Sequence, residues 1–130
     1  MKPYTDLDQS KQLAEILPID TADGYYEAQI NPKTEEWEVV LIPGNQWPSL
    51  EVVVPCWTLA ALLEVLPDRI DDRYDLVLGK LSANDGWYVC YEDNDLLFQH
   101  YHFHKHYVDN NNLFDACVEM ITILHKENEL

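Results

Sequence analysis

The alternation of hydrophobic and polar residues along this chain predicts a succession of short helices and strands. An apolar stripe formed by Leu13, Ile16 and Leu17 has the spacing of one helix face. Thr5 and Asp8 precede it with the three-residue separation of a capping box. We therefore expect a short first helix.

Two segments rich in aromatic and β-branched residues follow, at 24–30 and 37–42, and the turn sequence 31–34 with its proline lies between them. They predict a β-hairpin. Pro55 suits the first turn of a helix, and residues 56–66 are apolar on almost every side. This pattern predicts a second, central helix.

The second half of the chain predicts three more strands and a last helix. An alternating segment begins at Tyr74, and the turn sequence Asn84-Asp85-Gly86 leads to a strand at 87–91 and then to a strand around 100–107. Asn112 is a suitable N-cap for an amphipathic helix that extends to about Leu124. The expected order is αββαβββα.

This order predicts an α+β fold in which an antiparallel sheet of about five strands packs with three helices. The chain has 130 residues, 47% of them hydrophobic, and contains no repeat, low-complexity tract or linker. That length supports one core of ordinary size. We therefore predict a single domain, residues 1–130.

The charge of the chain is strongly negative and limits its partners. Twenty-four acidic residues stand against eight basic ones, which gives a formal charge of −16. Such a surface repels the phosphates of nucleic acids and of anionic lipids, so neither is an expected partner. The acids are scattered along the chain, which fits an ordinary solvated surface or, alternatively, a partner protein with a basic surface.

Three separated cysteines, Cys56, Cys90 and Cys117, lie among apolar residues and are expected to be buried thiols. They indicate a reducing, intracellular compartment, and we expect the protein to be cytoplasmic. No signal peptide is evident, and the longest apolar run, residues 52–66, is shorter than a membrane span.

Four histidines at two-residue spacing are the most unusual feature of the sequence. In an extended strand their side chains would share one face, while Tyr101, Phe103 and Tyr107 would point the other way, toward the core. Imidazoles on one face could bind Zn²⁺ or another divalent transition metal, whereas the alternatives are a solvated sheet face and adventitious metal binding. These histidines are His100, His102, His104 and His106.

Aromatic and acidic residues supply candidate partner contacts. Trp37, Trp57 and Trp87 are expected in the core, whereas Trp47, between two prolines, is a candidate surface anchor, together with Tyr25 or Tyr26. Acids on two predicted connectors are candidates for contact with a basic partner. These acids are Asp68, Asp71, Asp72, Glu92, Asp93 and Asp95.

No enzymatic constellation is recognisable in the sequence. The cysteines lie in apolar surroundings that favour the neutral thiol, and the four glycines are isolated, so no phosphate-binding loop exists. With so many carboxylates, no pair is specific enough to nominate as acid and base. We therefore expect a non-catalytic protein without a cofactor.

Two segments, residues 54–67 and 115–125, together with the strand at 87–92, resemble small uncharacterised proteins found in Bacteroidales genomes and in their phages or mobile elements. The resemblance covers roughly residues 50–130 and is carried by core positions. It implies a biological setting and no particular activity.

These observations favour a protein-interaction module or modulator of phage or mobile-element origin. One alternative is a metal-binding or metal-dependent protein that uses the face of His100 to His106. Another is a DNA mimic, in which ordered carboxylates imitate phosphates and inhibit a nucleic-acid-binding protein.

Overall fold

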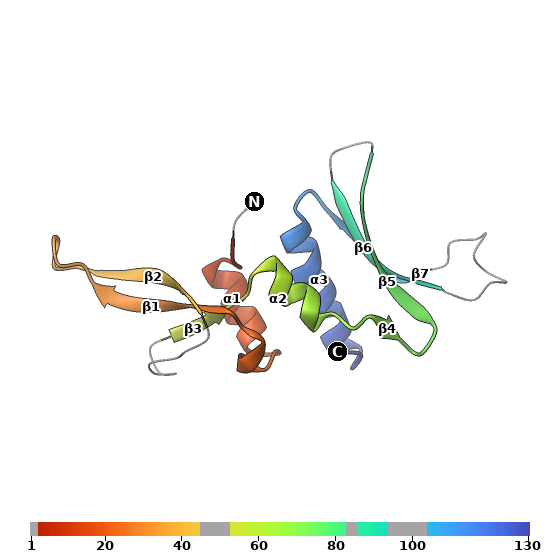
Figure 1. The fold of residues 1–130 in the computed structure, drawn as a ribbon, viewed down its shortest axis with the longest axis horizontal. Helices are drawn as coiled ribbons and strands as arrows, with labels where there is room; N and C mark the ends of the chain where they lie inside the picture. Colours follow the sequence, from red (N-terminus) through yellow and green to blue (C-terminus); the bar gives the residue numbers. More distant parts are fainter. Residues whose placement is uncertain (1–2, 45–52, 83–85, 94–103) are drawn as a thin grey trace. The chain divides into compact units, whose positions relative to one another are not determined.

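The computed structural model describes residues 3–44, 53–82, 86–93 and 104–130. The chain divides into two compact units, Lys2–Ala61 and Leu62–Leu130. Each unit contains an antiparallel sheet, of three strands in the first and four in the second (Figure 1).

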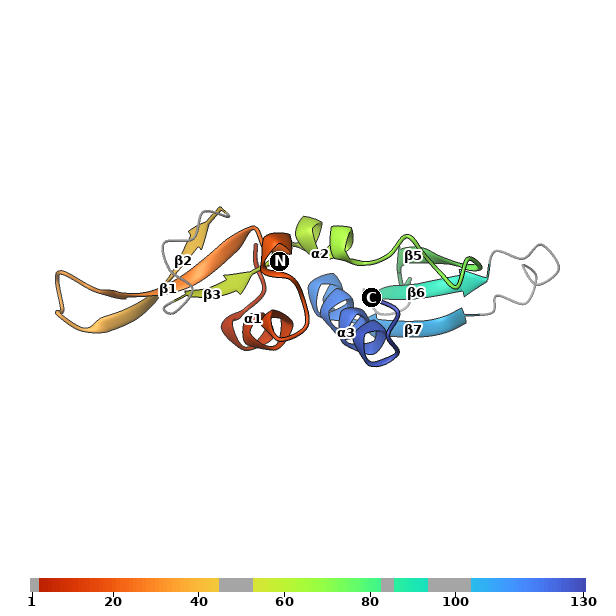
Figure 2. The same ribbon diagram turned by 90° about the horizontal axis from the view of Figure 1, so that it is seen from below.

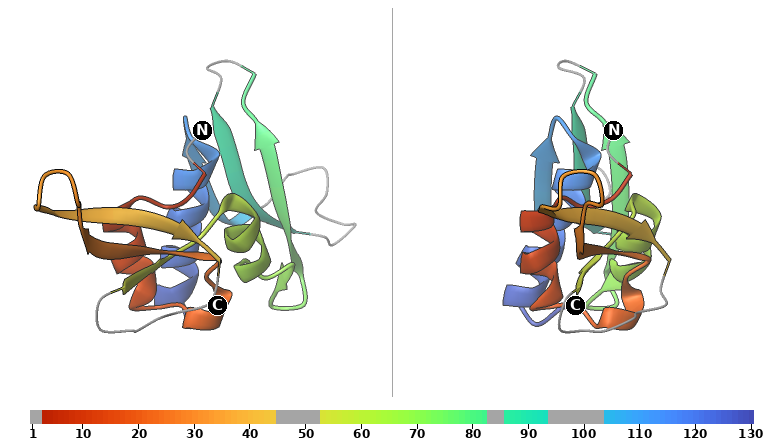
Figure 3. Two further views of the ribbon diagram at one scale, coloured as in Figure 1. Left: turned by 60° about the vertical axis from the view of Figure 1, so that its left-hand side comes forward. Right: turned by 90° about the vertical axis from the view of Figure 1, so that its left-hand side faces the viewer.

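The first unit combines a helix with a three-stranded sheet of order β2-β1-β3. Helix α1 packs against β3 (Figure 3). The elements are α1 (Leu7–Ala14), the 3-10 helix η1 (Ile19–Thr21), β1 (Gly24–Ile30), β2 (Trp37–Pro43) and β3 (Val53–Cys56). A second α-helix, α2 (Leu59–Val65), spans the division between the units.

A capping box begins α1 one residue later than the sequence pattern predicts. The Asp6 carboxylate accepts a hydrogen bond from the Gln9 backbone N–H at 2.8 Å, and the Gln9 side chain accepts one from the Asp6 N–H at 3.1 Å. Thr5 is buried instead, where its hydroxyl bonds to Ser10 at 2.7 Å and accepts the Trp57 N–H at 3.2 Å. Thr5 therefore ties the start of α1 to the residue after β3.

The prediction that a helix starts at Pro55 is wrong. Residues 53–56 pair with β1, and Pro55 lies opposite Tyr25. Proline is tolerated there because a strand at a sheet edge has one side without a neighbouring strand, where the missing backbone N–H leaves no hydrogen bond unmade. The helix starts only after Thr58, whose hydroxyl accepts the Ala61 N–H at 3.1 Å while its own N–H donates to Asp23 at 2.8 Å.

The second unit places a helix on a four-stranded sheet of order β4-β5-β6-β7. Helix α3 packs against β6 and β7 (Figure 2). Asn112 is the N-cap of α3, as the sequence predicts, and accepts the Phe114 N–H at 2.8 Å. The elements are β4 (Arg69–Ile70), β5 (Tyr74–Lys80), β6 (Trp87–Asp93), β7 (His104–Asn110) and α3 (Leu113–Lys126).

The predicted α+β class and element order are confirmed. Two short strands, β3 and β4, were not expected, and the strands form two sheets instead of one. The grouping of all 130 residues into one domain stays a prediction. Among the described residues, no helix has both the length and the apolar character needed to cross a membrane.

All three cysteines are buried free thiols. Burial, reinforced by nearby Asp23, raises the pKa of Cys56 to about 12, and burial with a smaller effect of Glu92 raises that of Cys90 to about 11. Burial alone raises the pKa of Cys117 to about 12. At neutral pH each thiol is therefore protonated and poorly nucleophilic.

We predict that all three thiols react with a maleimide only as fast as the protein opens. Native protein should be labelled much more slowly than protein in denaturant, because both burial and raised pKa values suppress the thiolate. Mass spectrometry of timed samples measures this rate. Rapid native labelling of any one cysteine would contradict its burial.

Candidate functional site

The hairpin formed by β1 and β2 extends beyond the third strand of its sheet (Figure 1). Strand β2 pairs with β1 over its full length, from Gly24 opposite Pro43 to Ile30 opposite Trp37. Strand β3 pairs only with residues 24–27 of β1. In the described part of the chain, the outer half of the hairpin is thus a two-stranded ribbon.

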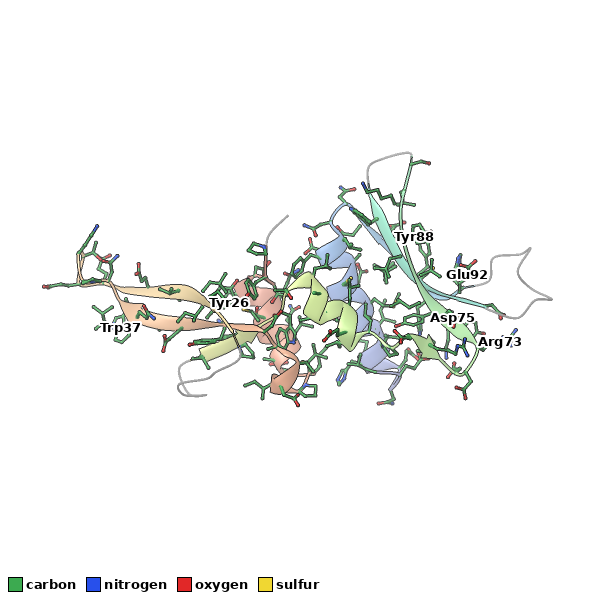
Figure 4. All side chains as sticks on the ribbon, viewed as in Figure 1. Tyr26, Trp37, Arg73, Asp75, Tyr88 and Glu92 are labelled. Carbon is green, nitrogen blue, oxygen red and sulfur yellow. The ribbon has the colours of Figure 1, made fainter. Side chains whose placement is uncertain are left out.

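One face of this outer half carries exposed apolar side chains. Ile30 lies directly opposite Trp37, and Ala28 lies opposite Val39, so their side chains point to the same face. Ile30 is 55% exposed, Trp37 72% and Val39 56%. Figure 4 shows Trp37 on the outer part of the hairpin, away from Tyr26. We call Ala28, Ile30, Trp37 and Val39 the hairpin face.

The turn that ends the hairpin is held by its own hydrogen bonds. The Asn31 N–H donates to the Glu36 carbonyl at 2.9 Å, and the Asn31 side chain accepts the Lys33 N–H at 2.8 Å. Glu35 has a positive φ of 59°. These bonds fix the register that pairs Ile30 with Trp37. The turn therefore determines which side chains share the hairpin face.

The hairpin that carries this face is acidic, and Glu27 and Glu38 lie on its opposite face. The hairpin carries four glutamates and one lysine, and the lysine lies at the turn. One glutamate, Glu38, accepts a hydrogen bond from Asn31 at 3.2 Å, and another, Glu27, accepts one from Gln29 at 2.8 Å. The four are Glu27, Glu35, Glu36 and Glu38.

The expectation that Trp37 lies in the core is therefore wrong, because no third strand covers its part of the hairpin in the described residues. Trp57 is fully buried, as expected, and Trp87 is partly buried. Trp47 lies outside the described residues. Its suggested companions are not surface anchors, since Tyr25 is buried and the Tyr26 hydroxyl donates to the Thr5 carbonyl at 2.7 Å.

The histidine pattern is interrupted by a β-bulge in β7. Cys90 of β6 pairs with Tyr107, but Glu92 pairs with His104, so Lys105 and His106 together oppose Tyr91. His104 therefore shares a face with Tyr107, and their ring centroids lie 5.4 Å apart. His100 and His102 lie outside the described residues.

His106 turns to the opposite face, where its Nε2 lies 2.7 Å from a carboxylate oxygen of Glu129. The predicted shared face of the histidines is thus wrong for His104 and His106. The prediction that Tyr107 points into the core is also wrong, because Tyr107 is 45% exposed. Tyr101 and Phe103 lie outside the described residues.

The end of α3 brings Glu129 to β7. Asn128 has a φ of 55°, and the Glu129 N–H donates to the Leu124 carbonyl at 2.8 Å, which is the bond of a Schellman motif. Lys105 Nζ lies 2.7 Å from the second carboxylate oxygen of Glu129 and also pairs with Asp71. We call Asp71, Lys105, His106 and Glu129 the terminal clamp.

Burial tends to raise the pKa of the Glu129 carboxyl, but hydrogen bonds and charges from Lys105 and His106 outweigh it and lower that pKa below its usual value. Hydrogen bonds to Asp71 and then to Glu129 raise the pKa of Lys105. The clamp thus favours the charged forms of both groups. We interpret it as a structural network that attaches the end of α3 to β7.

The other acids predicted to contact a partner have different environments. Asp72 is exposed, with a φ of 54°, in the turn between β4 and β5, and Asp68 is also exposed. Glu92 is partly buried. Asp93 does not fit a surface role, because its side chain is only 2% exposed and accepts two hydrogen bonds from the Arg73 guanidinium, at 2.7 and 3.0 Å.

Asp95 lies outside the described residues, as do two of the four histidines proposed as metal ligands. Within the described ranges, no group of three or more His, Cys, Asp or Glu side chains is placed to hold a metal ion. Comparisons of the chain with family models, with curated proteins and with solved structures find no match.

We predict that Glu129→Gln destabilises the protein by about 1–3 kcal/mol at neutral pH, because it removes a partly buried carboxylate that is paired with Lys105 and hydrogen-bonded to His106. Folding lowers the pKa of Glu129, so the ionised carboxylate adds to the free energy of unfolding at pH values above its pKa in the unfolded chain. This stabilisation is lost as the pH falls through its pKa in the folded protein. Urea unfolding of both proteins from pH 7 down to pH 3 measures this. A difference that does not shrink below about pH 4.5 would contradict the clamp.

We predict that His104 and His106 respond differently to substitution. His106→Ala should lower the melting temperature because Glu129 loses a partner, whereas His104→Ala should change it little because His104 is exposed. A metal site shared by both histidines would make Zn²⁺ raise the melting temperature of the wild type, and both variants would lose this increase. We expect no such increase. Differential scanning fluorimetry with and without Zn²⁺ measures both effects, and a gain lost equally in the two variants would restore the shared metal site.

Proposed function

We propose that this chain is a non-catalytic interaction protein that binds a partner protein through the hairpin face. The single observation that carries the proposal is the gathering of Ile30, Trp37 and Val39, each more than half exposed, on one face of the β1–β2 hairpin. Contiguous exposed apolar surface is uncommon on soluble proteins and is typical of interaction sites.

The chemistry of this face suits an interface centred on one anchor residue. Tryptophan is the side chain most enriched among residues that dominate binding energy, because a large rigid surface is buried at little entropic cost. The exposed β-branched pair beside it, Ile30 and Val39, enlarges the apolar centre. The preformed turn at Asn31 means that the partner does not have to order the backbone.

The charge of the hairpin favours a partner with an apolar pocket in a surface rich in Lys and Arg. Four glutamates against Lys33 give the hairpin an excess of three negative charges. Complementary charge acts mainly on the association rate and is screened beyond about 8 Å at physiological ionic strength. Capture of the partner should therefore weaken as salt concentration rises.

An origin in a phage or mobile element, and a cytoplasmic location, are part of this proposal and rest on the sequence resemblance and the buried thiols. The metal-binding alternative loses support, because the bulge separates His104 from His106. The DNA-mimic alternative loses support in the second unit, where Asp71, Asp75 and Asp93 are bonded to the chain's own cations.

We predict that an aromatic photo-crosslinking amino acid, which keeps a large apolar ring at position 37, captures one discrete partner in cells of the native host. The same residue at position 15, the exposed C-cap of α1, is the matched control. The adduct should form at position 37 and not at 15, and excess wild-type protein should compete with it better than Trp37→Ala protein does. Gel mobility and mass spectrometry of the adduct give the result.

Trp37→Ala should change the free energy of unfolding by no more than about 1 kcal/mol, since the side chain is mostly exposed, so lost capture cannot be ascribed to unfolding. An adduct of twice the chain mass would mean that the partner is a second copy. The same adducts at both positions, or none at 37, would contradict the proposal.

A further inference from the structure

A second surface lies in the other unit, on the face of the four-stranded sheet opposite α3. Val89 and Val108 face each other across β6 and β7 and are buried on the α3 side. Because side chains alternate along a strand, Tyr88, Tyr107 and Asp109 lie on the opposite face. We call Gly79, Tyr88, His104, Tyr107 and Asp109 the tyrosine face.

Three rings form a row on this face. A Cβ at Gly79 would lie 2.5 Å from atoms of the Tyr88 ring, so that ring lies directly over the glycine of the neighbouring strand. The Tyr107 ring is stacked with Tyr88, with centroids 5.9 Å apart and planes 12° apart. His104 continues the row beyond Tyr107. The close packing of the Tyr88 ring on Gly79 fixes one end of the row, and the His104 ring at the other end is tilted by 48° against Tyr107.

Negative charge surrounds the row. Asp109 lies directly opposite Tyr88 in the register of β6 and β7, and Glu92 lies opposite His104. Burial, and then the charge of Asp109, raise the pKa of the Tyr107 hydroxyl, which agrees with a carboxylate close to that ring. Asp75, opposite Glu92, is bonded to Arg69 at 2.7 Å. Figure 4 shows Tyr88, Glu92 and Asp75 along the same sheet.

Other rings of this sheet already carry the chain's own cations. Lys80 Nζ lies 5.1 Å from the centroid of Trp87, and the Arg73 guanidinium lies 5.6 Å from that of Tyr74. Within the described ranges, no lysine or arginine lies over Tyr88 or Tyr107. A stacked, partly exposed tyrosine pair next to a carboxylate has the chemistry to attract a cation from outside.

We infer that the tyrosine face binds an arginine side chain of a basic partner protein. A planar guanidinium can stack on the exposed Tyr107 ring and donate hydrogen bonds to the Asp109 carboxylate at the same time, which a lysine ammonium does less well. The site lies in Leu62–Leu130 and does not depend on the hairpin face, so either can fail without the other.

The probe is a capped tripeptide, acetyl-Gly-Arg-Gly-amide, titrated into the full-length ¹⁵N-labelled protein at fixed ionic strength. Peptides with lysine or citrulline in place of arginine are its controls. The expected result is a saturable chemical-shift change centred on the amides of Gly79, Tyr88 and Tyr107. The lysine peptide should bind more weakly, and the citrulline peptide, which lacks the charge, should not bind.

Variants separate a specific site from attraction to the overall charge. Tyr107→Leu and Asp109→Asn should each weaken the arginine peptide about two- to fivefold, the loss expected for an exposed cation–π or ion-pair contact. Glu119→Gln makes the same charge change at an exposed position of α3, in the same unit, and should leave binding unchanged. The spectra themselves report whether each variant is folded.

The inference is overturned if the shifts are spread over many acidic residues, if Glu119→Gln weakens binding as much as Asp109→Asn, or if no saturable shift occurs. Equal binding of the lysine and arginine peptides would overturn the assignment to arginine. None of these outcomes affects crosslinking at Trp37, which tests the hairpin face separately.

Discussion

The bulge in β7 determines what each face of the four-stranded sheet carries. Because Lys105 and His106 both oppose Tyr91, the alternation of side chains changes phase at this point of the strand. Lys105 and His106 can then both reach Glu129, while His104 and Tyr107 come together on the other face. Without the extra residue, His104 and His106 would share a face.

The scarcity of basic residues makes their placement informative. In the second unit Arg69, Arg73 and Lys105 are paired with carboxylates of the chain, and Lys80 lies over Trp87. Each of these cations contacts a carboxylate or an aromatic ring of its own unit. They therefore do little to offset the charge of acids elsewhere on the surface. The net charge of −16 already includes these cations, and an excess of this size can attract a basic partner.

Local patterns in the sequence were sufficient to predict the first hairpin and α3, since each depends on neighbouring residues: the turn at Asn31 and the cap at Asn112. Features that depend on distant residues were not predictable in this way. The strand at Pro55 exists because β1 pairs with it, and the bulge becomes apparent only when β6 supplies a register. The exposure of Trp37 becomes apparent only from the pairing of the described part of β3 with residues 24–27 of β1. One signal was available, because Trp37 is flanked by Glu36 and Glu38.

The hairpin face shows how binding surface and local stability can be coupled. A two-stranded ribbon without a third strand is only marginally stable in water, so the hydrogen bonds of the Asn31 turn hold its outer half, and cross-strand pairs such as Ile30 with Trp37 add a modest contribution. The same side chains remain accessible because nothing in the described chain covers them. A partner that covers them gains their burial without having to order the backbone, since the turn at Asn31 already fixes it. An exposed apolar ladder is otherwise an aggregation hazard, and the four glutamates of the hairpin oppose pairing of one hairpin with another. This repulsion favours a partner of opposite charge over a second copy of the same chain.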